Sequence, residues 1–143
     1  MLIEQVLKAK GREVTTVSAD DTLQMAAKVL DEARIGAVVA VDEHNQVVGV
    51  LSERDIVRHV AREGANSLDI PVRNAMTRHV LTAGTTERLD TCLERMTDRR
   101  VRHLPVLKDG ALDGLVSIGD LVKWKIAEAE AEASSLKAYV TSG

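Results

Sequence analysis

Aromatic residues are almost absent from this chain. Phenylalanine does not occur, and tryptophan and tyrosine occur once each among 143 residues. Proteins that bind single-stranded nucleic acids stack the bases on aromatic side chains, and nucleic-acid-binding domains in general carry an excess of positive charge. The formal net charge here is −3. We therefore expect no nucleic-acid partner.

Cysteine and long apolar runs are scarce too. Cys92 is the single cysteine, so no internal disulfide can form, and the N-terminal residues, which include Glu4, do not resemble a secretion signal. The longest apolar run, from Ala37 to Val41, is far shorter than the roughly 20 residues that span a bilayer. We expect a cytoplasmic protein with no membrane partner. The four histidines show no metal-ligand spacing, so we expect no metal site.

Aliphatic residues supply the apolar content instead. Hydrophobic residues make up 45% of the sequence and charged residues 29%, a balance that is typical of a globular chain. This length fits one compact domain or two joined half-domains.

The sequence contains an internal repeat. Residues 14–42 align with residues 80–108 without a gap, and Val14, Thr16 and Leu23 are identical to their counterparts. Apolar residues recur in both copies at the spacing of one helix face: Leu23, Ala26, Ala27 and Leu30, then Leu89, Cys92, Leu93 and Met96. Residues able to cap these helices precede them: Asp20 and Asp21, then Thr85 and Thr86. Cys92 is thereby predicted to be a core thiol.

Each copy predicts the order strand, helix, strand, strand, helix, which indicates an α+β fold. We expect an N-terminal helical segment at 1–13, with Ile3, Val6 and Leu7 facing the core, repeat 1 at 14–66, repeat 2 at 67–128 and a helical tail at 129–143. About 50 residues cannot bury both faces of a sheet. The two repeats should therefore pack on each other through their sheets.

A Gly-x-x-Ser-x-x-Asp pattern occurs in both copies, at the junction of the last strand and the last helix. It comprises Gly49, Ser52 and Asp55 in repeat 1, and Gly114, Ser117 and Asp120 in repeat 2. The glycine would let a ligand approach the backbone, and the carboxylate can accept hydrogen bonds from ribose hydroxyls. Arg54 and the free N–H groups of the helix start would favour phosphate. A single Ser-x-x-Asp is equally an ordinary capping box, but its recurrence at the same junction favours a ligand site.

These features together resemble a tandem pair of CBS domains, the Bateman module. The resemblance rests on residues 35–42, 49–55, 75–77, 102–106 and 114–120, which are spread over nearly the whole chain apart from the tail. It implies two clefts between the repeats, each holding adenine among aliphatic side chains, ribose at an aspartate and phosphate at basic residues.

The resemblance assigns roles by position. Asp55 and Asp120, assisted by Ser52 and Ser117, would contact ribose; Thr16 and Thr82 would border adenine; Ala37, Val38, Leu104 and Pro105 would lie around it; and Arg54, Arg102 and His103 would meet phosphate. Repeat 1 has Gly36 and Ala37 where repeat 2 has Arg102 and His103, and Gly119 stands where Arg54 would be expected. The two clefts are therefore predicted to bind unequally.

The predicted function is regulatory sensing of an adenosine ligand such as AMP, ADP, ATP, NAD(H) or S-adenosylmethionine, read out by a partner protein. The tail carries a narrow apolar stripe, Ala129, Ala133, Leu136 and Val140, which favours a homodimer. Catalytic motifs are absent, so we expect no enzyme and no catalytic cofactor. Two alternatives stay open: a protein scaffold with degenerate clefts, which a nucleotide-dependent thermal shift would exclude, and a nucleotide-consuming enzyme, which would show turnover.

Overall fold

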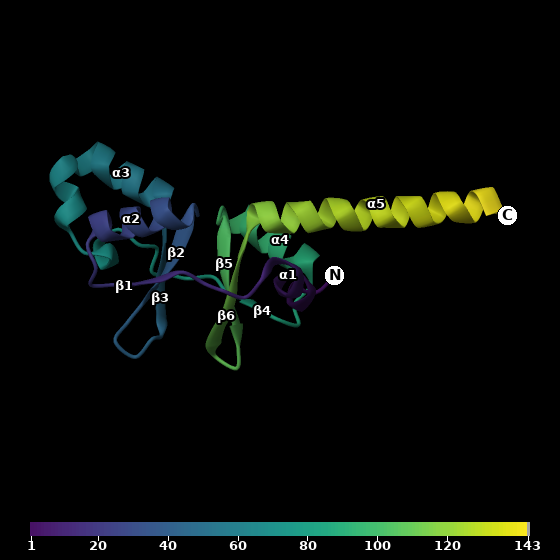
Figure 1. Ribbon diagram of the computed structural model, residues 1–143, viewed down its shortest axis with the longest axis horizontal. Coiled ribbons are helices and arrows are strands. Elements are labelled where there is room, and N and C mark those ends of the chain that lie inside the picture. Colours follow the sequence, from purple (N-terminus) through teal and green to yellow (C-terminus); the bar gives the residue numbers. More distant parts are fainter. Residues whose placement is uncertain (143) are drawn as a thin grey trace.

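The computed structural model describes residues 1–142 and consists of two α+β repeats (Figure 1). Repeat 1 contains β1 (Thr16–Ser18), α2 (Leu23–Ala33), β2 (Ala37–Val41), β3 (Val47–Ser52) and α3 (Glu53–Glu63). Repeat 2 contains β4 (Ala83–Gly84), α4 (Leu89–Arg99), β5 (His103–Lys108), β6 (Ala111–Ser117) and α5 (Ile118–Ser142). The predicted fold class and element order are confirmed.

Three further helices lie outside this pattern. Helix α1 (Ile3–Lys10) precedes repeat 1, and two short 3-10 helices (Ala65–Asp69 and Val72–Asn74) connect the repeats. The division of the chain at residues 66 and 67 stays a prediction, because these connecting helices belong in space to repeat 1, as described below.

Each repeat forms a three-stranded sheet, in the order β1-β2-β3 or β4-β5-β6. The first strand runs parallel to the second, and the second runs antiparallel to the third. The two sheets share an irregularity as well. The register of the β2–β3 pairing shifts between Ala40 and Val41, and that of the β5–β6 pairing shifts between Val106 and Leu107. These are equivalent positions of the repeat.

The helices cover the sheets with the faces that the sequence pattern predicts. Leu23, Ala26 and Leu30 of α2 are buried, and so are Leu89, Cys92 and Met96 of α4. The predicted core position of the Cys92 thiol is therefore confirmed, and burial raises the pKa of that thiol.

The predicted helix caps are wrong. The N-cap residues are Thr22, whose hydroxyl accepts from the Met25 N–H at 3.1 Å, and Arg88, whose side chain makes no capping bond. In both helices the first backbone N–H finds its acceptor outside the repeat. The Leu23 N–H donates to the Ile70 carbonyl and the Leu89 N–H donates to the Met1 carbonyl, both at 2.9 Å. The aspartates and threonines lie just before these starts, where local composition alone cannot distinguish them from the caps.

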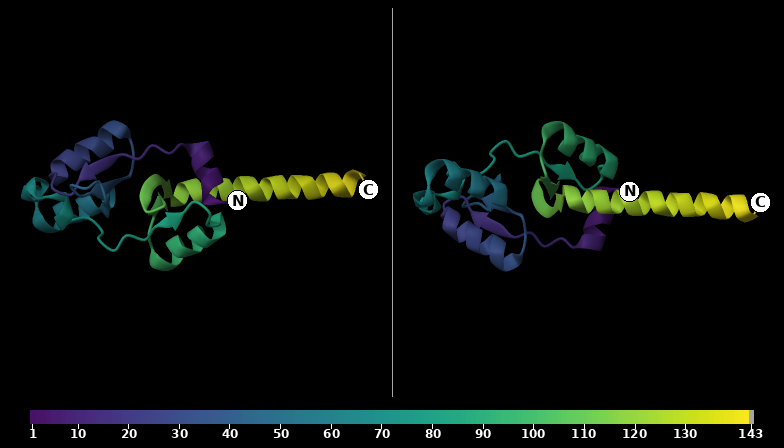
Figure 2. Two further views of the ribbon diagram at one scale, coloured as in Figure 1. Left: turned by 90° about the horizontal axis from the view of Figure 1, so that it is seen from below. Right: turned by 90° about the horizontal axis from the view of Figure 1, so that it is seen from above.

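Each core is completed by a segment from outside its own repeat. Ile3, Val6 and Leu7 of α1 are fully buried in the core of repeat 2, as part of one cluster with Leu89 and Leu104. The segment after α3, which includes Val72 and Met76, packs in the core of repeat 1. Figure 2 shows the two connections that run between the halves. We call these two segments, residues 1–10 and 68–76, the exchanged arms.

The side chains of these arms pack against the glycines of the two Gly-x-x-Ser-x-x-Asp patterns. A Cβ at Gly49 would lie 2.7 Å from Met76 Cγ, and a Cβ at Gly114 would lie 3.0 Å from Leu7 Cδ1. The expectation that these glycines make room for a ligand is wrong, because the side chains of the arms fill that space. The close packing of chain on chain explains both glycines.

Helix α5 begins in the core of repeat 2 and continues well beyond it (Figure 1). Leu121 is fully buried and Trp124 packs against the core. Farther along, the stripe residues Ala129, Ala133, Leu136 and Val140 are exposed. None of the helices within residues 1–142 is both long enough and apolar enough to cross a membrane.

Candidate functional site

Both Ser-x-x-Asp turns form reciprocal capping boxes. The Ser52 hydroxyl accepts from the Asp55 N–H at 3.2 Å, while Asp55 Oδ2 accepts from the Ser52 N–H at 2.9 Å. In repeat 2 the same two bonds between Ser117 and Asp120 measure 3.1 and 2.8 Å. The interpretation of Ser-x-x-Asp as a helix capping box is therefore correct in both copies. Capping occupies Oδ2 of Asp55, and Oδ1 accepts a long hydrogen bond from the Arg58 guanidinium at 3.4 Å.

A cleft of about 400 Å³ opens beside the first of these turns, between the two repeats. Repeat 1 contributes the end of β3 and the first two turns of α3. Repeat 2 contributes Thr77, residues 79–81, the end of α4 and its connection to β5. Five of the predicted site residues line this cleft: Ser52, Arg54, Asp55, Arg102 and His103.

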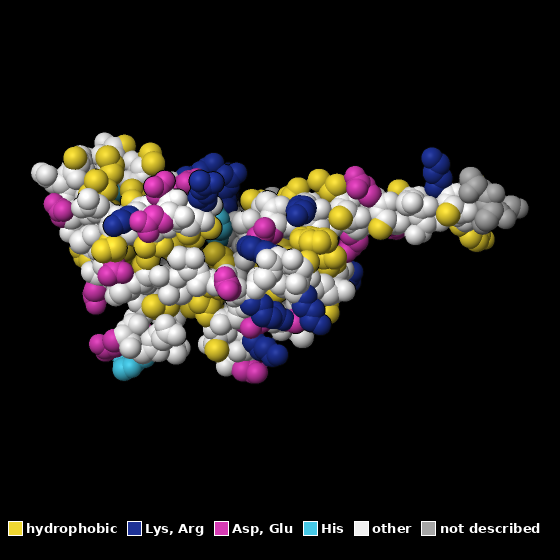
Figure 3. Space-filling view, in the orientation of Figure 1, with side chains coloured by type: hydrophobic (Ala, Val, Ile, Leu, Met, Phe, Trp, Pro, Cys, Tyr) yellow, Lys and Arg dark blue, Asp and Glu magenta, His cyan; other side chains and the backbone are white. Residues whose placement is uncertain are grey.

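The cleft also contains basic residues that the sequence analysis missed. They are Arg58, His79, Arg99 and Arg100. Arg58 follows Arg54 by four residues on α3, so helix periodicity could have placed the two on one face. Arg99 and Arg100 precede Arg102 with only Val101 between them, so this basic segment can be recognised in the sequence. Figure 3 shows Lys and Arg side chains gathered where the two halves of the molecule meet.

The other eight predicted residues do not line this cleft: Thr16, Ala37, Val38, Thr82, Leu104, Pro105, Ser117 and Asp120. Four of them lie buried in the middle strands, β2 and β5. Thr16 is exposed in β1, and the Thr82 carbonyl accepts from Arg95 at 2.8 Å. The ligand-binding roles of all thirteen residues stay predictions.

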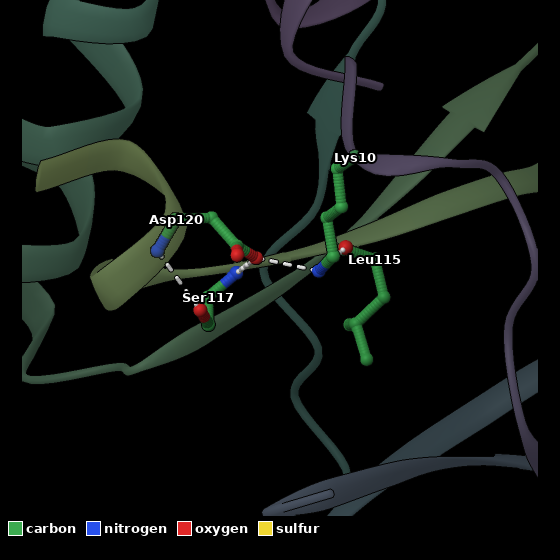
Figure 4. Close-up of polar contacts among 4 residues, drawn as sticks. All are labelled: Lys10, Leu115, Ser117 and Asp120. Carbon is green, nitrogen blue, oxygen red and sulfur yellow. Dashed lines mark hydrogen bonds and ion pairs between the residues drawn. The ribbon is translucent and has the colours of Figure 1, made fainter. Parts of the chain in front are cut away.

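Asp120 is engaged by a lysine from the N-terminal arm (Figure 4). Lys10 Nζ donates to Asp120 Oδ2 at 2.5 Å and to the Leu115 carbonyl at 2.6 Å. At the equivalent place in repeat 1, the Val50 carbonyl accepts from the backbone N–H of Thr77 at 2.9 Å. The Lys10 ammonium thus satisfies a carbonyl that backbone satisfies in repeat 1, and it neutralises the aspartate at the same time.

Electrostatics reflect this difference between the two turns. Burial alone would raise the pKa of the Asp120 carboxyl, but the hydrogen bonds from Lys10 and Ser117 outweigh it, so the pKa lies below its ordinary value. His103 lies where the cleft and the Lys10–Asp120 pair meet. Burial, and then the positive charge of Lys10, lower the pKa of the His103 imidazole. This shift favours the neutral form of the His103 imidazole.

No group of three or more His, Cys, Asp or Glu side chains is placed to hold a metal ion within the described part of the chain. The polar side chains that line the cleft carry guanidinium, imidazole, carboxylate and hydroxyl groups. Together they suit an anionic ligand that also presents hydroxyl groups.

Comparisons with known proteins agree with the repeat. The CBS-domain-containing protein CBSX3, mitochondrial, of Arabidopsis thaliana is 33% identical over 99% of this chain and 72% of its own length. The crystal structure of the CBS-domain-containing protein ATU1752 from Agrobacterium tumefaciens superposes with a TM-score of 0.82 at 43% identity, covering 85% of this chain and 91% of that one.

A third similar protein was crystallised with a nucleotide. The CBS domain protein PAE2072 from Pyrobaculum aerophilum, complexed with AMP, has a TM-score of 0.75 at 29% identity, covering 84% of this chain and 89% of that one. The CBS domain family itself matches residues 9–62 and 72–127. With two such matches over most of its length, this chain belongs to the CBS domain family.

Proposed function

We propose that this protein is a regulatory module that binds an adenosine nucleotide in the cleft beside Asp55. One observation carries the proposal: a cleft of about 400 Å³ places the Asp55 carboxylate, whose Oδ1 has only a long contact with Arg58, among basic side chains at the boundary of the two repeats. That volume lies within the range of small-molecule sites. The AMP complex of the related Pyrobaculum aerophilum protein supports an adenosine ligand.

Within the cleft, each group has a distinct part. Asp55 Oδ1 accepts a hydrogen bond from ribose, while Oδ2 keeps capping α3. Arg54, Arg102 and His103 line the cleft, where they are available to bind the phosphate. Since these groups are donors and acceptors of the kinds that bind ribose and phosphate, we assign the site a binding role.

Regulation follows from where the ligand contacts the chain. Repeat 1 supplies the ribose acceptor, and repeat 2 supplies most of the basic residues. A nucleotide in the cleft therefore stabilises the arrangement in which both sets of groups reach it, at the expense of other arrangements of the repeats. A partner protein that prefers one arrangement reads the ligand concentration through this difference.

Self-association is the second part of the proposal. The far half of α5 presents apolar residues to solvent, among them Leu136 at 67% exposure and Val140 at 71%. A long helix with an uncovered apolar stripe packs readily against a second copy. We propose a homodimer that uses this helix.

Isothermal calorimetry of nucleotide-stripped protein tests the ligand proposal. AMP should bind, and Asp55→Ala should weaken it about tenfold to a hundredfold, as expected for a lost hydrogen bond to a charged group. Asp120→Ala is the matched control, because it removes the same capping box from repeat 2. It should change AMP affinity by less than about threefold.

Two results would contradict the proposal. Equal losses in both variants would mean that the effect of Asp55→Ala is structural. No heat with AMP, ATP, NADH or S-adenosylmethionine, from protein that melts cooperatively, would instead favour a scaffold that binds only proteins.

A further inference from the structure

The cleft beside Asp55 concentrates positive charge in a protein whose net charge is negative. Five arginines line it, namely Arg54, Arg58, Arg99, Arg100 and Arg102, with His79 and His103. Only two carboxylates, those of Glu53 and Asp55, lie among them. The lining therefore carries an excess of three positive charges, whereas the whole chain has a formal charge of −3.

Four of these arginines lack a charge partner. Arg58 lies 3.4 Å from Asp55, but Arg54, Arg99, Arg100 and Arg102 form no ion pair with any other residue in 1–142. Outside the cleft, Arg95 pairs with Glu87 at 2.5 Å. Like charges held around one concave site repel one another, and low-dielectric walls strengthen the field. An anion in the cleft would relieve that repulsion.

The fold does not require these charges. Repeat 1 makes the same helix-to-strand connection between α2 and β2 with Ala33, Arg34 and Gly36, where repeat 2 has Arg99, Arg100 and Arg102. Both connections end their helix in the left-handed conformation, with φ of 55° at Arg34 and 54° at Arg100. Only one of the three positions is basic in repeat 1, so the structure can be built without the other two charges.

The arginines line the cleft from two sides. Two lie on the first two turns of α3, and three lie at the end of α4 and on its connection to β5 in the other repeat. A single phosphate carries about 1.5 to 2 negative charges and is small compared with a lining that extends over both elements. A chain of phosphates matches both the number of guanidinium groups and their spread.

We propose that the cleft selects adenosine ligands that carry a pyrophosphate or a longer phosphate chain, namely a nucleoside diphosphate, a triphosphate or a pyrophosphate-bridged dinucleotide. The inference rests on the proposed function, and it narrows the ligand class. The order of affinity is then ADP, ATP or NADH first, AMP next and adenosine last. S-adenosylmethionine, whose sulfonium is positive, is disfavoured by the same field.

Calorimetry with adenosine, AMP, ADP, ATP, NADH and GTP tests this order. We expect ADP or ATP to bind about tenfold more tightly than AMP, since each added phosphate gains charge-assisted hydrogen bonds. Arg100→Gln should weaken ATP about tenfold and change adenosine affinity less than twofold. Arg34→Gln, which removes an arginine of the same backbone conformation outside the cleft, should leave every affinity unchanged.

The outcomes separate the two proposals. AMP binding as tightly as ADP and ATP, with no effect of Arg100→Gln, would overturn the selection of phosphate chains and leave the adenosine site intact. GTP binding as tightly as ATP, with the same dependence on Arg100, would support the phosphate selection and contradict the adenosine proposal. Absence of binding by all six compounds would overturn both. A comparison of NADH with ATP then identifies which of the pyrophosphate ligands is preferred.

Discussion

Replacing Lys10 with methionine should both destabilise the protein and free Asp120. Methionine keeps an unbranched apolar side chain but removes the ammonium, which donates to Asp120 and to the Leu115 carbonyl. The Lys10 and Asp120 side chains are 34% and 26% exposed, so solvent screens the pair only in part.

The magnitude follows from this half-buried position. An exposed ion pair contributes at most about 1 kcal/mol, and a hydrogen bond to a charged group contributes about 1.5–3 kcal/mol. We expect Lys10→Met to lower the free energy of unfolding by about 1–2 kcal/mol. For a chain of this length that corresponds to a fall in Tm of roughly 3–6 °C.

Thermal unfolding by circular dichroism measures the loss, with Lys8→Met as the control. Lys8 is exposed on the same helix, so its replacement should leave Tm unchanged within about 1 °C. Equal Tm values for both variants would refute the assigned role of Lys10.

The same variant tests whether Lys10 prevents a ligand from binding at the Ser117–Asp120 turn of repeat 2. Without the ammonium, Asp120 Oδ2 retains only the Ser117 N–H, as Asp55 Oδ2 retains the Ser52 N–H. Calorimetry should then show a second, weaker AMP site per chain in Lys10→Met. A stoichiometry that stays at one would mean that other features of repeat 2 exclude the ligand.

Three further predictions concern packing, pH and assembly. Gly49→Ala should lower stability in urea by about 1–3 kcal/mol, because its Cβ would lie 3.0 Å from the Thr77 carbonyl oxygen; Gly36→Ala, with no neighbour closer than 3.8 Å, is the control and should cost far less. Stability should fall as pH drops below 6.5, because the lowered pKa of His103 makes the unfolded state take up the proton first; His103→Gln should flatten that part of the Tm–pH curve, and an unchanged curve would contradict this. Truncation after Ala127 should leave Tm nearly unchanged but weaken self-association in sedimentation velocity, and a truncated chain that sediments as the same oligomer would exclude α5 from the interface.

Local patterns in the sequence were enough to predict the repeated elements. The apolar spacing in α2 and α4 describes one helix face, and tertiary packing kept that face buried. The Gly-Ser-Asp spacing correctly located both strand-to-helix junctions. These features are local, so the residues that determine them are close together in the chain.

Features that depend on distant residues could not be predicted in this way. The start of α4 is satisfied by the Met1 carbonyl, and Gly114 accommodates Leu7. The contact between Lys10 and Asp120 joins residues 110 positions apart, and Lys10 lies outside the repeat pattern. The basic segment from Arg99 to Arg102 can be recognised in the sequence. Its position opposite α3 in the cleft depends on how the two repeats pack, which the sequence pattern does not give.

The exchanged arms have a consequence for how such a chain can arise and change. Backbone hydrogen bonds join Ile3 to Glu87 at 2.9 Å and Val72 to Asp21 at 2.7 Å, so the first arm is fixed to repeat 2 and the second arm to repeat 1. A gene fragment encoding residues 1–66 would carry the arm of its missing neighbour and lack its own. The smallest unit that can be inherited, duplicated or fused to another protein as a folded whole is therefore the pair, not the single repeat.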